Sequence, residues 1–323
     1  MERILVTGAA GFLGANFVRA LLHRGEEVHA LVRPDGDLWR LEEIRESIGI
    51  HAVDLADVEP VIDLVTRLRP QRIFNLAAKG GHQTTRDDRL RAVACNVLGT
   101  WNLLEAARQV DCLRFVQVGS STEYGPHAYP LEESLRDQPT TFRGATKAAA
   151  TLACLQAARE GSVPTVILRS FSVYGAWEGA HRFVATTIRA ALGGGEMRLT
   201  KSGFRRDFVH IDDVVRASLL AARAEGVVGE IINIGTGIQT SNEDLVHAVE
   251  SVTGATIRVQ PGTYPSSPSD TGHWCADIEK AGRLLAWRPQ NSLEEGLRLS
   301  VEWFRRRGEP AGRTGDVRGD GGS

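Results

Sequence analysis

Thr7-Gly8-Ala9-Ala10-Gly11-Phe12-Leu13-Gly14 is the stretch that decides the fold of this chain. It follows directly on the apolar segment Arg3–Thr7, which has the character of a buried strand. It also opens the amphipathic segment Phe12–His23, whose apolar residues recur at helical spacing. A strand that turns through glycines into a helix begins a βαβ unit, so we expect the chain to start a parallel sheet.

The three glycines of this stretch have separate physical tasks in a dinucleotide site. Gly8 permits a tight turn, Gly11 lets the backbone approach a pyrophosphate, and Gly14 allows close packing of the helix on the strand. The helix offers its free N–H groups and the positive end of its dipole to the same pyrophosphate. We therefore expect these glycines, with the intervening Phe12 and Leu13, to bind a dinucleotide.

Strand-like and helix-like segments alternate through the first half of the chain. The expected strands are Arg3–Thr7, Glu27–Val32, Ile50–Val53, Arg72–Leu76, Leu113–Val118 and Thr165–Leu168. The expected helices between them are Phe12–His23, Val58–Leu68, Leu90–Gln109 and Ala145–Glu160. This alternation predicts an α/β fold with a doubly wound parallel (Rossmann) sheet that is covered by helices on both faces.

The regular alternation of strands and helices ends near Tyr174, and a smaller α/β substrate-binding region is expected after it. Its expected helices are Asp212–Ala224, Glu243–Val252, Asp277–Leu285 and Leu293–Arg307, with strands at Ile231–Ile234 and Thr256–Val259. We predict a dinucleotide-binding domain over residues 1–174, to which later segments return, and a mainly substrate-binding region over 175–307. The tail 308–323 is rich in Gly, Arg and Asp, has little to bury and is expected to be disordered.

Composition argues against several classes of function. Lys and Arg number 38 against 40 Asp and Glu, which leaves no strong field to attract nucleic acid or an anionic membrane. The cysteines show no metal-ligand spacing, so we expect free thiols and no metal site: Cys95, Cys112, Cys154 and Cys275. Met1 leads straight into the first strand without a signal sequence, and no apolar run approaches membrane-spanning length, so a cytoplasmic protein is expected.

Further motifs follow the glycine-rich turn in a set order. Asp54-Leu55 follows the third expected strand, Leu76-Ala77-Ala78 ends the fourth, and Asn96 stands before a Gly-Thr step. Together with the spacing Gly-x-x-Gly-x-x-Gly, they resemble the extended short-chain dehydrogenase/reductase superfamily, in its NAD-dependent nucleotide-sugar epimerase/dehydratase branch. The resemblance covers roughly residues 3–305 and implies that these motifs line NAD or NADP.

The end of the second expected strand bears on the choice between the two cofactors. NAD-preferring proteins of this fold carry an acid there, which binds the ribose 2′-OH. This chain has Val32 at that point, followed by Arg33, whose guanidinium could pair with a 2′-phosphate. The sequence therefore favours NADP, with NAD as the alternative.

The reacting end departs from the family pattern at one position. Ser120, after the fifth strand, matches the family's catalytic Ser/Thr, and Lys147 matches the lysine of its Tyr-x-x-x-Lys helix. In the family the tyrosine transfers the proton, while the lysine lowers its pKa and holds the nicotinamide ribose. Arg143 stands where the tyrosine belongs, and a guanidinium that stays protonated cannot exchange a proton in its place.

Other groups could take over the missing acid/base function. Tyr124 and Glu123 are near Ser120 in the sequence, and His82 follows the fourth strand. The substrate could also carry its own acid. The sequence does not choose between these sources.

The resemblance also implies a set of substrate contacts. Ser121 and Thr122 stand where 4,6-dehydratases carry an Asp-Glu pair, which disfavours 4,6-dehydration. Ser172 replaces an asparagine that usually touches the substrate. Arg206 matches an arginine that grips the diphosphate of a nucleotide sugar, whereas a second family arginine is absent from Pro265–Asp270. The expected substrate-binding residues are Ser121, Thr122, Arg143, Ser172, Arg206 and Asn233.

These observations favour an NAD(P)-dependent oxidoreductase or epimerase of a nucleotide sugar, with 4-keto reduction or epimerisation as the reaction. Two alternatives remain. Ser172 and the absent arginine suggest a reductase or isomerase of a different small molecule, and Arg143 suggests a non-catalytic NAD(P)-binding protein. Apolar residues on Leu90–Gln109 and Ala145–Glu160 favour a homodimer that forms through a helix bundle.

Overall fold

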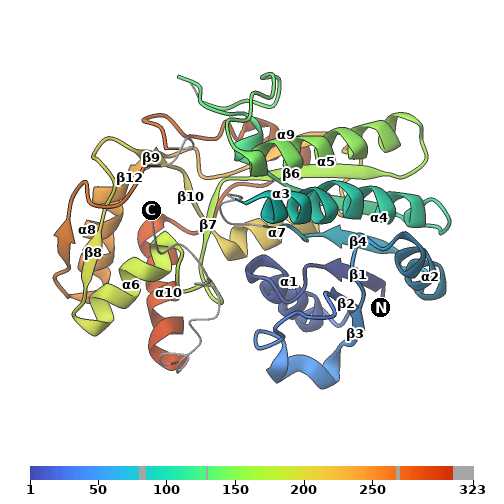
Figure 1. Cartoon of the computed structure of the whole chain (residues 1–323), viewed down its shortest axis with the longest axis horizontal. Coiled ribbons are helices and arrows are strands. Elements are labelled where there is room, and N and C mark those ends of the chain that lie inside the picture. Colours follow the sequence, from blue (N-terminus) through green and yellow to red (C-terminus); the bar gives the residue numbers. More distant parts are fainter. Residues whose placement is uncertain (80–84, 129, 267–269, 308–323) are drawn as a thin grey trace.

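The computed structural model describes residues 1–79, 85–128, 130–266 and 270–307, and a seven-stranded parallel sheet forms its centre (Figure 1). The strand order is β11-β6-β5-β4-β1-β2-β3, and every neighbouring pair is parallel. The strands are β1 Arg3–Thr7, β2 Glu27–Val32, β3 Gly49–Ala52, β4 Arg72–Asn75, β5 Arg114–Ser120, β6 Thr165–Ser170 and β11 Ile231–Ile234. The predicted doubly wound α/β fold is confirmed.

Helices cover both faces of the sheet because side chains alternate along each strand. In β1, Ile4 and Val6 pack in one core cluster with α1 (Phe12–His23), α7 (Ile211–Ala221) and α9 (Glu279–Leu285). Leu5 points to the opposite face and packs with α2 (Val58–Leu68), α4 (Gly99–Ala107) and α5 (Phe142–Arg159). The central strands are therefore buried on both sides, as their continuous apolar runs predict.

The strand order reverses between β1 and β4, which makes their carboxyl ends the switch point of the sheet. Ligands of doubly wound sheets bind in the crevice outside such a point. The glycine-rich turn after β1 and the segment after β4 both lie at this edge. The topology therefore places the expected cofactor residues where a dinucleotide binds.

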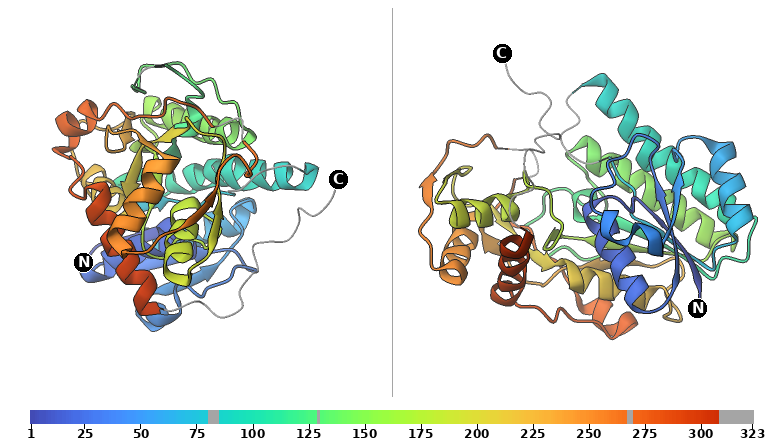
Figure 2. Two further views of the ribbon diagram at one scale, coloured as in Figure 1. Left: turned by 90° about the vertical axis from the view of Figure 1, so that its left-hand side faces the viewer. Right: turned by 90° about the horizontal axis from the view of Figure 1, so that it is seen from below.

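A second group of elements lies beside the sheet, to the left in Figure 1. It has its own apolar cluster, with Ile188, Leu245 and Leu297 among the fully buried members. The helices are α6 Phe183–Gly193, α8 Asn242–Thr253 and α10 Leu293–Arg307, and the short strands are β8 Glu196–Arg198 and β13 Arg258–Gln260. Figure 2 shows from two further sides that this group stands next to the sheet.

Four short strands join this group to the carboxyl edge of the large sheet. β7 (Ser172–Tyr174) pairs in parallel with β10 (Phe208–His210), and β9 (Arg205–Arg206) pairs with β12 (Thr240–Ser241). β11 also lies within residues 175–307 and is part of the large sheet. Residues from both halves of the chain thus converge on the edge that carries Ser120.

The single helix predicted over Leu90–Gln109 is wrong in detail. The structure has α3 (Arg86–Val93), the π-helical turn η2 (Ala94–Leu98) and α4 in its place. Such turns are frequent at functional sites, and this one contains Asn96. The strands β7 to β10 and β12 and the helix α6 were not predicted, since most are too short to show a periodicity.

Two further findings concern the chain as a whole. Within 1–79, 85–128, 130–266 and 270–307, no helix is both long enough and apolar enough to cross a membrane. His82 and the tail 308–323, for which we stated expectations, lie outside the described residues.

Candidate active site

The glycine-rich turn has the close packing that its sequence predicts. Gly8 has a φ of 63°, and a Cβ atom there would lie 2.7 Å from the Cα of Ala77. A Cβ at Gly14 would lie 2.2 Å from the carbonyl oxygen of Gly8. Only glycine fits either position.

The N-terminus of α1 is available to an anion. Gly11 is the N-cap residue and provides no side-chain hydrogen bond to the first turn. The first-turn amides of a helix have no partner within the helix, so those of Phe12, Leu13 and Gly14 present N–H donors and the positive dipole end. A Cβ at Gly11 would meet only the Gly8 carbonyl oxygen, at 3.0 Å, which leaves this side of the turn open. These features fit the pyrophosphate of a dinucleotide.

A buried polar network fixes the segment after β4 against this turn. The Thr7 hydroxyl donates to Asn75 Oδ1 at 2.6 Å and accepts from the Ala77 amide at 3.2 Å. Asn75 Nδ2 donates to Gln117 Oε1 at 2.8 Å, on the neighbouring strand β5. Three strands are thus joined beneath the site, which holds Leu76, Ala77 and Ala78 beside the glycines.

The residues expected near the adenosine make fewer hydrogen bonds than those of the network beneath the glycine-rich turn. Asp54 Oδ1 accepts from the Ala56 amide at 2.9 Å, and the Leu55 carbonyl accepts from Asn102. Arg33 is well exposed, and its Nε lies 3.6 Å from Asp35 Oδ1. The Arg33 guanidinium can therefore meet a ligand, but a carboxylate stands beside it.

Asn96 is used within the protein. It is 1% exposed, its Oδ1 accepts from the Lys79 amide, and its Nδ2 donates to the Thr146 hydroxyl. These bonds join the segment after β4 to α5, next to Lys147. Both polar groups of the Asn96 side chain therefore bind within the protein, and the expected cofactor contact of Asn96 stays a prediction.

Ser120 and Lys147 meet at the carboxyl end of β5. Lys147 Nζ is buried and donates to the carbonyl oxygen of Val118, two residues before Ser120. Ser120 Oγ lies 2.9 Å from Thr122 Oγ1, and either hydroxyl can be the donor. Burial lowers the pKa of the Lys147 amine, Glu123 opposes this change, and Arg143 reinforces it.

Arg143 lies in the first turn of α5, one turn before Lys147. That turn packs on the segment after β5, since a Cβ at Gly144 would lie 2.4 Å from the Thr122 carbonyl oxygen. Arg143 Nε is fully buried and has no hydrogen-bond partner among the described residues. Burial lowers the pKa of Arg143 to about 10, and the positive charge of Arg182 adds to this lowering.

The loop after β7 brings a second arginine that no sequence motif indicated. Arg182 Nε donates to Glu178 Oε1 at 2.7 Å, and its Nη2 donates to the Val173 carbonyl at 2.9 Å. Its guanidinium carbon lies 5.3 Å from the centre of the Phe12 ring, at the start of α1. Arg182 therefore stands between the glycine-rich turn and the reacting end of the site.

Two of the alternative proton donors are excluded by their surroundings. Glu123 is fully buried and pairs with Arg169 at 2.9 Å, while its other oxygen accepts from the Ser120 amide. The Tyr124 hydroxyl donates to Asn233 Oδ1 at 2.8 Å, and burial raises the pKa of Tyr124 above its ordinary value. Both side chains serve the core and have no access to a substrate.

The expected substrate residues separate into closed and open positions. Asn233 is fully buried between Tyr124 and the Leu131 carbonyl, so this side chain has no free surface for the predicted substrate contact. The Ser121 hydroxyl is also closed off, because Ser121 is buried and accepts a bond from Trp274 Nε1. Thr122, Arg143, Ser172 and Arg206 keep partly exposed side chains.

Arg206 carries a carboxylate partner. Its Nη2 donates to Asp270 Oδ1, and the Arg206 side chain remains 27% exposed. A diphosphate would have to bind the free part of this guanidinium or displace Asp270. Asp207, the next residue, is buried and accepts hydrogen bonds from the backbone amides of Thr236 and Gly237. The aspartate of the Arg-Asp motif therefore has a structural role in this chain.

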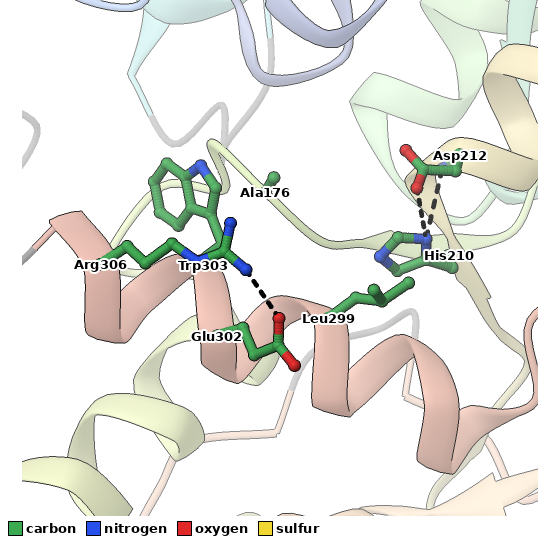
Figure 3. Close-up of a pocket in the computed structure, with 7 residues that line it drawn as sticks. All are labelled: Ala176, His210, Asp212, Leu299, Glu302, Trp303 and Arg306. Atoms are coloured by element: carbon green, nitrogen blue, oxygen red, sulfur yellow. Dashed lines mark hydrogen bonds and ion pairs between the residues drawn. The ribbon is translucent and has the colours of Figure 1, made fainter.

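A separate pocket of about 200 Å³ lies between α10 and the start of the loop after β7 (Figure 3). His210 and Asp212 line it on one side, and Glu302 pairs with Arg306 on the other. The residues that line it are Ala176, His210, Asp212, Leu299, Glu302, Trp303 and Arg306. None of the expected cofactor, catalytic or substrate residues takes part in this pocket.

A doubly wound sheet with a glycine-rich turn, an uncapped first helix and a Ser-Lys pair at the edge of β5 defines a dinucleotide-binding Rossmann protein of the short-chain dehydrogenase type. Residues 4–235 match the NAD dependent epimerase/dehydratase family. The chain belongs to this family of enzymes.

Similar proteins cover nearly the whole chain. The UDP-glucose 4-epimerase of Mycolicibacterium smegmatis is 31% identical in an alignment of 318 residues that covers 95% of this chain and 100% of that protein. The UDP-glucose 4-epimerase of Thermotoga maritima, solved with UDP-glucose, has a TM-score of 0.85 at 29% identity and covers 94% of this chain and 99% of its own. The UDP-glucuronic acid 4-epimerase of Bacillus cereus, solved with UDP-glucuronic acid and NAD, has a TM-score of 0.85 at 28% identity, with the same coverage of 94% and 99%.

Proposed function

We propose that this protein is an NAD-dependent enzyme that acts on a nucleotide sugar, by epimerisation or by reduction of a 4-keto group. The proposal places Ser120 and Lys147 at the reacting end and Arg143 in the position of the family's tyrosine. The observation that carries it is the bond from the buried Lys147 amine to the Val118 carbonyl, at the edge of the sheet that also bears Ser120. The glycine-rich turn, at the neighbouring switch point, supplies the cofactor end.

The cofactor residues of the proposal are those of the turn and its neighbours. NAD, when bound, exchanges a hydride with the sugar carbon. The open turn at Gly11 and the uncapped helix N-terminus fit its pyrophosphate. We propose that Asp54 and Leu55 lie beside the adenine and that Leu76, Ala77 and Ala78 line the rest.

We propose NAD in preference to the NADP that Arg33 suggests. The Bacillus cereus relative was solved with NAD, and the family is described as NAD dependent. In this chain Asp35 stands beside the Arg33 guanidinium and would repel a 2′-phosphate. Dissociation constants for both cofactors, for the wild type and for Arg33→Ala, test this choice.

Ser120 and Lys147 have separate tasks in the proposed reaction. The Ser120 hydroxyl donates a hydrogen bond to the reacting carbonyl oxygen and polarises it. The Lys147 ammonium has three N–H donors, of which the Val118 carbonyl takes one, so the others can hold the nicotinamide ribose. The positive charge of Lys147 also favours negative charge that develops on the sugar oxygen.

The proton that a tyrosine would deliver needs another route. Arg143 stays positively charged near neutral pH, since even its lowered pKa of about 10 lies well above neutrality. We propose that Ser120 gives its proton to the sugar oxygen and regains one from Thr122, whose hydroxyl is 2.9 Å away. Thr122 is partly exposed and can exchange its proton with water.

The experiment that tests this function is a turnover assay on the purified protein. Nucleotide 4-keto-sugars with NADH or NADPH, and UDP-glucose and UDP-glucuronate with NAD, are incubated with the protein, and sugar products and reduced cofactor are measured. Turnover of a nucleotide sugar supports the proposal. Cofactor binding without any turnover would favour a non-catalytic protein, and turnover of other carbonyl compounds alone would favour a different small-molecule reductase.

We also propose that the protein forms a homodimer through α4 and α5. Large apolar side chains stand exposed on this side of the molecule: Leu98 at 50%, Trp101 at 45% and Leu152 at 62%. α4 and α5 lie side by side in Figure 1, so a two-fold related copy could complete a four-helix bundle.

A further inference from the structure

Within the part of the chain that the structure describes, Arg143 is a cation without a counter-ion. Among the described residues, no carboxylate lies within ion-pair distance of its guanidinium, and its buried Nε has no acceptor. A buried charged donor without a partner is costly, and such groups in native proteins are usually bound to something. Because the Arg143 side chain is partly exposed, an acceptor can reach the rest of this guanidinium.

Two further positive groups interact electrostatically with Arg143. Arg182 is close enough to lower its pKa, and Arg143 in turn lowers the pKa of Lys147. Glu123 is the carboxylate that raises the pKa of Lys147, and it is already paired with Arg169. Arg143, Arg182 and Lys147 thus form a positive cluster at the reacting end of the site.

The second arginine of this cluster is held in place from behind. Glu178 binds Arg182 Nε at 2.7 Å, and the Val173 carbonyl binds Arg182 Nη2 at 2.9 Å. The Arg182 side chain nevertheless remains 38% exposed. A guanidinium that is anchored on one side and exposed on the other is suited to receive an anion, because its planar fork matches a carboxylate or a phosphate.

We propose that Arg143 and Arg182 bind the carboxylate of a sugar acid, so that the substrate is a nucleotide-linked uronate. This inference rests on the proposed function and specifies its substrate class. In a uronate the carboxylate is attached to C5, next to the C4 carbon that reacts. An arginine in the place of the tyrosine, which would otherwise approach the C4 oxygen, is within reach of that carboxylate.

A phosphate of the cofactor is the other anion that could meet these arginines. Its expected place is the N-terminus of α1, where the first-turn amides and the helix dipole already serve it. Arg143 lies instead in the first turn of α5, against Thr122 and one turn from Lys147. Its position therefore favours the sugar end over the cofactor end.

The test compares two ligands that differ only at C6. Dissociation constants of UDP-glucose and UDP-glucuronate are measured by calorimetry with the NAD-loaded protein, for the wild type and for Arg143→Gln and Arg182→Gln. Arg159→Gln is the matched control, because Arg159 is an exposed arginine at the far end of the same helix. The dissociation constant of NAD is measured for each variant as well.

We expect the wild type to bind UDP-glucuronate about 10- to 100-fold more tightly than UDP-glucose, the range for a charge-assisted hydrogen-bonded pair. Arg143→Gln should remove most of this preference, Arg182→Gln should reduce it, and Arg159→Gln should keep it. If the two dissociation constants of the wild type agree within about twofold, the uronate inference is overturned by the wild type alone. The proposed function would remain. A loss of NAD affinity in Arg143→Gln with an unchanged sugar ratio would also overturn the uronate inference, in favour of a cofactor phosphate.

The proposed function fails in a different way. If neither UDP- nor dTDP-linked sugars bind the NAD-loaded protein, the nucleotide-sugar assignment is contradicted, and the uronate inference falls with it. If both UDP-sugars bind equally well, only the uronate inference is lost.

Discussion

At the level of single residues, the proposed place of Arg143 in the position of the family's tyrosine would change which chemistry the site can perform. A tyrosine next to a lysine gives and takes a proton, whereas a guanidinium near neutral pH gives charge and hydrogen bonds. In the proposed site, Lys147 holds the nicotinamide ribose but has no tyrosine to activate. Ser120 at the end of β5 and Lys147 on α5 remain on the same side of the site, because the Lys147 amine binds the Val118 carbonyl of β5.

Ser120→Ala tests the role of the remaining hydroxyl. The substitution removes the donor to the reacting oxygen and breaks the link to Thr122, so we expect kcat to fall by about 10²- to 10⁴-fold. Cofactor binding should not change. Ser134→Ala, at an exposed serine, is the control, and equal rates for the two variants would contradict the role of Ser120.

Glu178 predicts a dependence of stability on pH. Burial raises the pKa of Glu178 to about 7, above its ordinary value of 4.5. The folded protein therefore holds this proton more tightly than the unfolded chain, and the resulting stability is fully present below about pH 4.5 and lost as the pH rises through about 7. The difference in melting temperature between the wild type and Glu178→Gln should change over this interval, and a constant difference would show that Glu178 is ionised throughout.

At the level of elements, the glycine-rich turn was predictable because each glycine answers a local steric demand. β1, α1 and α2 have the predicted bounds, since their apolar spacing is regular and their ends are marked by Gly or polar residues. The π-helical turn at Asn96 was not predictable. It depends on bonds from the Asn96 side chain to Lys79 and Thr146, which are distant in the sequence.

Gly14→Ala tests the packing of α1 on the turn. The new Cβ would lie 2.2 Å from the Gly8 carbonyl oxygen, so the helix must shift, at a cost of about 1–3 kcal/mol in the free energy of unfolding. NAD affinity should fall with it, because the shift moves the first-turn amides. Gly193→Ala in α6 is the matched control, since nothing lies within 4 Å of its Cβ position, and denaturant unfolding should show it to be neutral.

At the level of the whole molecule, the site is assembled from segments that lie far apart in the sequence. The glycine-rich turn, the end of β5 and the start of α5 carry motifs and were predicted. Arg182 and Glu178 come from the loop after β7 and were missed, because that loop has no pattern that marks its charged residues. The burial of Asn233 and Ser121 was equally hidden, since it depends on Tyr124 and Trp274.

The proposed dimer predicts a change of mass in solution. Trp101→Glu and Leu152→Glu place charges on the exposed apolar side of α4 and α5, and we expect light scattering to show monomers for both variants and a dimer for the wild type. Tyr264→Glu is a control, because Tyr264 is 54% exposed and lies outside this surface. A monomeric wild type would contradict the proposed dimer.

The measurement that tests the central claim most directly is the kcat/KM of Arg143→Tyr beside that of the wild type, with the nucleotide sugar that the wild type turns over best. If Arg143 binds the substrate and the proton takes another route, the variant restores the Tyr-x-x-x-Lys pattern but gains nothing, or loses activity through a higher KM. A gain of about 10²-fold or more, the size of a recovered acid/base group, would show instead that Arg143 only impairs an otherwise ordinary site.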